Sequence, residues 1–291
     1  MLHAQEAKGR PLDAETLCLL GAAYAGTGDV AQAVESYRAA SAQSPHDTRP
    51  YIELAMLSMD HQSPAVAVGV LDAGIRSNPD SAALHTMRGS IYAQLANNDA
   101  AQKEFETADR LAPTDVAATL GLGMMLRDES NLDQAEEVLR AKLKQKPGDA
   151  VLSYLLADVL MRRGAMPGDA GFKEAEDLLQ TAILRQPTLT QAHAALGKMK
   201  LKEGYTQEAI AELEKATKLD PQDRTALNQL IAAYRRSNRA QDADRVAAQL
   251  AKSVDGDRAL ETEKNRVHLM LEVPGASASV ATPSGEGSRP E

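Results

Sequence analysis

Large aromatic side chains are nearly absent from this 291-residue chain, which contains no tryptophan, 2 phenylalanines and 7 tyrosines. Compact cores of this size normally obtain much of their buried area from aromatic rings. β-Sandwiches and barrels are also enriched in aromatic and β-branched residues, so the composition disfavours them. Alanine, by contrast, occurs 51 times. A core built from many small side chains favours closely packed helices.

Cysteine and long apolar segments are also scarce. The single cysteine, Cys18, excludes an intramolecular disulfide framework and a metal site with several cysteine ligands. No apolar run approaches the ~20 residues that a membrane-spanning helix needs. The first ten residues lack the apolar core of a signal peptide. The sequence therefore predicts a soluble chain without a membrane span, and its compartment stays open.

Acidic residues outnumber basic residues, 41 to 32, so the formal net charge is −9. Binding to nucleic acid needs a basic face that neutralises phosphates. Nucleic acid is therefore not an expected partner.

Proline recurs at a nearly constant interval along the chain. Successive members of one set are 34, 34, 34, 34, 40 and 34 residues apart, namely Pro11, Pro45, Pro79, Pro113, Pro147, Pro187 and Pro221. A period of this length is typical of repeat proteins, in which each unit is one supersecondary element. Units that end two residues after each proline, and a seventh unit without a closing proline, are 14–47, 48–81, 82–115, 116–149, 150–189, 190–223 and 224–257.

Small and large residues recur in phase with these prolines. The eighth position is Gly or Ala in six of the seven units, and the twentieth position, allowing for an insertion in unit five, is always Ala. A large apolar residue, such as Tyr37 or Phe105, follows four residues later in six units. Each unit has two apolar-periodic stretches of about 13 residues, too short to be stable helices alone. We expect pairs of helices that approach closely at the small residues and stack on neighbouring units.

Unit one resembles the tetratricopeptide repeat through the segment LGAAY at residues 20–24, followed by Ala33, Tyr37, Ala40 and Pro45. The resemblance extends over residues 14–257. It implies an all-α fold, a right-handed superhelical solenoid of about seven helix-turn-helix units.

Three positions depart from the family pattern. Arg88 replaces the usual leucine in unit three, Ser58 replaces an aromatic residue in unit two, and Lys142 replaces a small residue in unit four. We expect these departures to alter local packing and not the fold.

Both ends of the chain lie outside the seven units. Residues 1–13 are either the remnant of a preceding repeat or an N-terminal cap, since Pro11 lies where an earlier unit would close. A terminal repeat needs a polar-faced cap, and we expect residues 258–273 to supply it as a helix, with an extended ending as the alternative. Residues 274–291 are rich in Ser, Gly, Ala and Pro, which predicts a disordered tail.

No constellation of residues indicates catalysis, so we expect no enzyme, no metal site and no cofactor. The histidines lack the close spacing of a zinc-binding helix, and His85 and His193 occupy equivalent packing positions. Cys18 is expected to be a small buried residue. Gly121 and Gly123 do not follow a strand, so a phosphate-binding loop is not predicted.

The resemblance also implies a concave groove, lined by the first helices of successive units, that receives a partner peptide or helix. The positions facing it form a methionine-rich apolar zone in the early and middle units and a basic zone in the later units, with two arginines between. The predicted groove residues are Ile52, Met56, Met59, Leu120, Met124, Arg127, Tyr154, Met161, Arg162, Lys198, Lys202, Arg235 and Arg236.

Each zone has an alternative interpretation. Methionine suits surfaces that adapt to varied partners, but the same residues can pack unit against unit. Basic side chains favour an acidic or carboxylate-bearing segment, but near the end of a helix they also complement its dipole. Chaperone-docking members of the family use lysines, asparagines and an arginine that the corresponding positions here, such as Cys18, Ala22 and Met87, do not provide. That clamp is therefore not expected.

These features predict a non-catalytic protein-protein interaction scaffold. Two other hypotheses stay open: a structural repeat arm of a larger bacterial envelope or export assembly, and a regulatory arm cut from a longer enzyme-containing chain. Unit five carries six extra residues within 165–171, a loop that either contacts a partner or is a tolerated extension. The sequence predicts no oligomeric state.

Overall fold

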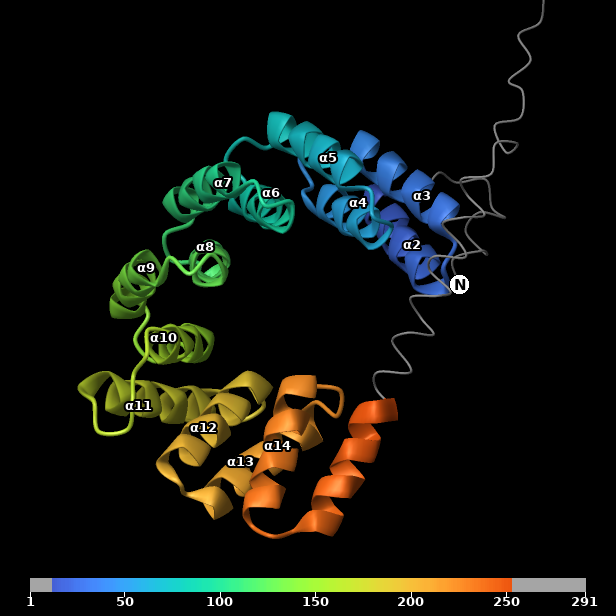
Figure 1. The fold of residues 1–291 in the computed structure, drawn as a ribbon. Helices are drawn as coiled ribbons and strands as arrows, with labels where there is room; N and C mark the ends of the chain where they lie inside the picture. The colour runs from blue at the N-terminus through green and yellow to red at the C-terminus, as the bar shows by residue number, and fades with distance from the viewer. Residues whose placement is uncertain (1–11, 253–291) are drawn as a thin grey trace, which may run out of the picture. The chain divides into compact units, whose positions relative to one another are not determined.

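The computed structural model describes residues 12–252, and all regular structure in that range is helical (Figure 1). The helices are α2 (Ala14–Thr27), α3 (Val30–Gln43), α4 (Arg49–Asp60), α5 (Pro64–Ser77), α6 (Ala82–Gln94), α7 (Asn98–Leu111), α8 (Ala117–Asp128), α9 (Leu132–Gln145), α10 (Ala150–Arg162), α11 (Ala170–Arg185), α12 (Thr190–Glu203), α13 (Thr206–Leu219) and α14 (Arg224–Arg236). Residues 240–252 are also helical. The expected all-α fold class is thereby confirmed.

Several expectations concern residues beyond this range. Residues 1–11, the end of unit seven at 253–257, the expected cap at 258–273 and the expected tail at 274–291 lie outside the described residues.

The described residues divide into two compact parts, an N-terminal part that ends at Leu196 and a C-terminal part that begins at Gly197. In the N-terminal part, helices pack in consecutive pairs, from α2 with α3 to α10 with α11. The first helices of successive pairs also contact one another, in the order α2, α4, α6, α8 and α10. Figure 1 shows α4, α6 and α8 on the inner side of α5, α7 and α9. The first helices of this part therefore form one continuous surface.

The turn inside each pair has the same backbone geometry in every unit. One residue per turn has a positive φ, between 55° and 96°: Gly28, Gln62, Ala96, Ser130, Gly164, Gly204 and Asn238. The next amide donates back to the carbonyl five residues earlier, as in Asp29 N to Tyr24 O at 2.9 Å and Asn97 N to Tyr92 O at 2.9 Å. These left-handed residues terminate the first helices. Four of them are not glycine, although glycine suits this conformation best.

We predict that Gln62→Gly will raise the free energy of unfolding by about 0.5–1 kcal/mol, because glycine removes the steric cost of a side chain at positive φ. The reciprocal change, Gly28→Ala, introduces that cost and should lower the free energy by a similar amount. Urea titrations followed by circular dichroism measure both. Stabilisation by Gly28→Ala would contradict the left-handed assignment.

Small residues bring the two helices of a pair together. An added Cβ would lie 2.7 Å from Tyr37 Cε1 at Gly21 and 2.9 Å from Leu139 Cδ2 at Gly123, both too close for ordinary packing. The alanines at the twentieth position, such as Ala33, are buried. The expected close approach of small residues and the large side chain between them is therefore confirmed at these pairs.

Two alanine substitutions in α2 test this packing, because one site is filled and the other is open. Gly21→Ala should lower the free energy of unfolding by about 1–3 kcal/mol, since the new methyl group displaces the Tyr37 ring. Gly26→Ala meets no atom within 4 Å and should raise the free energy by up to about 1 kcal/mol through helix propensity. Equal effects at both sites in thermal and urea denaturation would rule out the packing explanation.

Candidate partner-binding surface

The first helices of the N-terminal part expose methionine beside buried apolar residues. On α4, Met56 is 47% exposed whereas its neighbour Leu57 is 8% exposed. On α8, Met124 is 47% exposed whereas Met125 is 7% exposed. The surface of α4 and α8 therefore carries apolar side chains that the helix stack itself does not cover.

The other predicted apolar groove residues are half-buried, namely Ile52, Met59, Leu120, Tyr154 and Met161. Ile52 and Met59 pack against the buried cluster that includes Tyr51 and Leu71. Packing within the stack therefore accounts for the partial burial of Ile52 and Met59, as the alternative interpretation proposed. It does not cover Met56 and Met124, which are exposed.

The two arginines predicted between the zones share one carboxylate. Arg127 Nη1 lies 3.3 Å and Arg162 Nε 3.0 Å from the same oxygen of Asp158. Arg127 also pairs with Asp128 at 2.8 Å. These ion pairs join α8 to α10 and reduce the positive charge that the two arginines present to a partner.

A cavity of about 520 Å³ opens between α6, α7 and α8. It is lined by Ser90, Ala93, Gln94, Ala96, Asn98, Phe105, Gly121, Met124, Met125, Asp128 and Glu129. Only Met124 was among the predicted groove residues. The signal in the sequence is Gly121, whose position carries a side chain in every other unit.

The predicted basic residues of the C-terminal part, Lys198 and Lys202 on α12 and Arg235 and Arg236 on α14, are all exposed. Arg236 Nη1 donates to the carbonyl of Leu201 at 3.1 Å. Within residues 12–252, the side chains of Lys198, Lys202 and Arg235 form no ion pair. Their charges are therefore available to a partner.

The helix-dipole interpretation fits part of this basic set. Lys202 lies in the last turn of α12, and Arg235 and Arg236 lie in the last turn of α14, where a positive charge stabilises a helix. Lys198 is one turn earlier on α12, so the dipole does not account for it.

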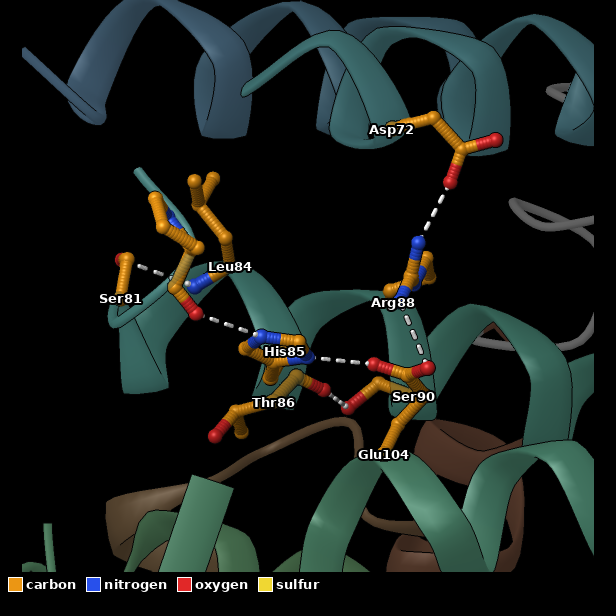
Figure 2. A network of polar contacts seen from close by, with 9 residues as sticks. Asp72, Ser81, Leu84, His85, Thr86, Arg88, Ser90 and Glu104 are labelled. Carbon is orange, nitrogen blue, oxygen red and sulfur yellow. Dashed lines mark hydrogen bonds and ion pairs between the residues drawn. The ribbon is translucent and has the colours of Figure 1, made fainter. Parts of the chain in front are cut away.

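A polar network explains the departure at Arg88 (Figure 2). Arg88 Nη1 donates to Asp72 at 2.5 Å, and Nη2 donates to Glu104 at 2.7 Å. Glu104 also contacts His85 Nδ1 at 2.7 Å, and His85 Nε2 lies 3.1 Å from the carbonyl of Pro79. The arginine thus bonds to second helices of two successive units, α5 and α7. The network holds helices together, and His85 has the structural role expected of it.

Lys142 is accommodated in a similar way. Its side chain is buried, and Nζ lies 2.5 Å from Asp109 and 2.7 Å from the carbonyl of Pro113. Thr119 donates to the same oxygen of Asp109 at 3.0 Å. The lysine therefore connects α9 to the preceding unit in place of the usual small-residue contact.

We predict that Arg88→Leu will lower the free energy of unfolding by about 1–3 kcal/mol although it restores the family's usual residue, because it removes the ion pair of the half-buried Glu104, which keeps its contact with His85. The double variant Arg88→Leu, Glu104→Gln should recover part of this loss. Double-mutant analysis by urea titration measures the coupling. A fully stable single variant would show that the network contributes nothing.

The described residues offer little reactive chemistry. Burial raises the pKa of the Cys18 thiol, which opposes formation of the nucleophilic thiolate. Among residues 12–252, no group of His, Cys, Asp and Glu side chains could hold a metal ion. No helix in the same range is long and apolar enough to cross a membrane.

Comparison with known families agrees with the helix pairs. Models of the tetratricopeptide repeat match residues 24–91, 86–150 and 120–182, which together span more than half of the chain. The chain belongs to the tetratricopeptide repeat family. A model of the bacterial transcriptional activator domain matches residues 170–268.

A curated relative carries the same repeat. Human tetratricopeptide repeat protein 34 is 34% identical over 110 residues, which are 38% of this chain and 18% of that protein. The chain thus matches less than a fifth of this relative's length.

Solved structures share the fold at low sequence identity. A tetratricopeptide repeat protein from Parabacteroides merdae has a TM-score of 0.61 at 20% identity, over 80% of this chain and 89% of that chain. Yeast Tom70 has a TM-score of 0.67 at 19% identity, over 94% of this chain and 59% of that chain. PilW, a type IV pilus biogenesis factor, has a TM-score of 0.56 at 22% identity, over 69% of this chain and 90% of that chain. These structures show that the chain shares their fold.

Proposed function

We propose that the chain is a non-catalytic scaffold that binds a partner peptide or helix on the surface formed by its first helices. The observation that carries this proposal is the accessibility of the predicted groove residues. All of them are exposed or half-buried, whereas neighbouring positions on the same helices are core residues. Exposed methionines supply apolar contact area that adapts to different partners.

The C-terminal part adds a second mode of recognition to this proposal. Lys198, Lys202 and Arg235 can form charge-assisted hydrogen bonds with an acidic side chain or a terminal carboxylate. We therefore expect the N-terminal part to favour apolar partner segments at α4 and α8, and the C-terminal part to favour acidic partner segments at α12 and α14.

A peptide library displayed on phage and selected on the whole chain tests the proposal. Selected peptides are then measured against the variant Met56→Asp, Met124→Asp and the variant Lys198→Glu, Arg235→Glu. Loss of apolar burial at two methionines should weaken binding at least tenfold, since each fully buried methionine contributes about 1.5–3 kcal/mol. Peptides with acidic residues should be the ones that lose affinity for the charge-reversed variant.

Matched controls place the same changes on second helices. Leu184→Asp alters an apolar side chain of α11 that is 79% exposed, and Lys218→Glu reverses an exposed charge on α13. Both should change the dissociation constant less than twofold. Unchanged affinity of every selected peptide for both groove variants would overturn the proposal. It would favour a structural or regulatory arm that does not use this surface.

A further inference from the structure

The cavity between α6, α7 and α8 combines an apolar base with a rim of one charge. Phe105, Met124 and Met125 supply the apolar surface, and Asp128 and Glu129 are the charged residues of its lining. No lysine, arginine or histidine lines it. This composition differs from the exposed basic residues of the C-terminal part.

Gly121 brings the Phe105 ring into the lining of the cavity. An added Cβ at Gly121 would lie 2.5 Å from Phe105 Cε1. The missing side chain therefore lets the Phe105 ring lie directly against α8. The equivalent residues in the neighbouring units are Met87 and Leu155. The small side chains of Ser90 and Ala93 line the wall of the cavity on α6.

The negative character of the rim comes from the end of a helix. Asp128 is the last residue of α8 and Glu129 is its C-cap, so both carboxylates add to the negative end of the helix dipole. Arg127 offsets part of the Asp128 charge through their ion pair at 2.8 Å. Glu129 is exposed and forms no ion pair with any residue between 12 and 252. Its charge is available to a cation at the cavity mouth.

We propose that this cavity is an anchor site for a partner segment in which an apolar side chain is followed by lysine or arginine. The apolar side chain enters against Phe105, Met124 and Met125, and the cation pairs with Glu129. The inference rests on the proposed scaffold function and specifies the chemistry that one part of its surface selects.

Methyl NMR tests the site directly, because two methionines line the cavity. The protein is labelled with ¹³C at the methionine methyl groups, and the Met124 and Met125 signals are assigned with Met→Leu variants. The probes are three capped peptides with serine and glycine flanks and the central pairs leucine-lysine, leucine-glutamate and alanine-lysine. Only the leucine-lysine peptide should shift both signals to saturation, with a dissociation constant at least fivefold lower than that of either other peptide.

Two variants separate the apolar and the charged contributions. Ala93→Phe, on the half-exposed side of α6, should fill the cavity and abolish the shifts without unfolding the chain, which circular dichroism checks. Glu129→Lys should reverse the preference in favour of the leucine-glutamate peptide. Glu137→Lys, an exposed acid on α9, is the matched control and should leave the preference unchanged. Raising the salt concentration should weaken the leucine-lysine peptide selectively, because an exposed ion pair is screened.

The outcomes distinguish this inference from the scaffold proposal. Equal affinity for the leucine-lysine and leucine-glutamate peptides, or unchanged binding to Ala93→Phe, would overturn the anchor site. Phage-selected peptides that lose affinity for the single variant Met56→Asp would then leave the scaffold function standing. Saturable shifts at Met124 and Met125, together with unchanged affinity of every selected peptide for Met56→Asp, would support the cavity and contradict the broader groove.

Discussion

The close approach of two helices at a glycine or alanine is the interaction on which the rest of this structure depends. At Gly21, a single added carbon would collide with the Tyr37 ring. Because small residues recur at one position of nearly every unit, large side chains can fill the space between helices without any tryptophan. Each helix is too short to be stable alone, so the pair and its neighbours stabilise it. The scarcity of aromatic residues follows from this packing.

Where that packing pattern is broken, polar contacts replace it. Arg88 occupies a position that the repeat normally gives to leucine, and it donates to carboxylates on two helices. Lys142 occupies a position normally given to a small residue, and it donates to a carboxylate of the preceding unit. A buried charge without partners would be strongly destabilising. The partners Glu104 and Asp109 therefore allow the fold to accept these residues. They connect successive units and leave the inner surface to other side chains.

The inner surface consists of the positions that helix packing does not bury. In the N-terminal part, positions that face neither the paired helix nor the next unit remain accessible, and there the chain carries methionine on α4 and α8. The C-terminal part exposes basic residues on α12 and α14. Small residues also line the cavity, namely Gly121 on α8 and Ser90 and Ala93 on α6. Its acidic rim and the basic residues of the C-terminal part would select segments of opposite charge.

Periodicity in the sequence was sufficient to predict the helices, their pairing and the turns between them, because each repeat needs only local spacing and its neighbours. The family resemblance implied that Met56 and Met124 face a groove, and both are exposed. Periodicity could not predict the partners of Arg88 and Lys142, since these contacts join residues 16 to 33 positions apart. Nor could it reveal the cavity, because Gly121, Ala93 and Phe105 come from three helices. Such features depend on the distances between side chains of different units, and only the tertiary structure determines those distances.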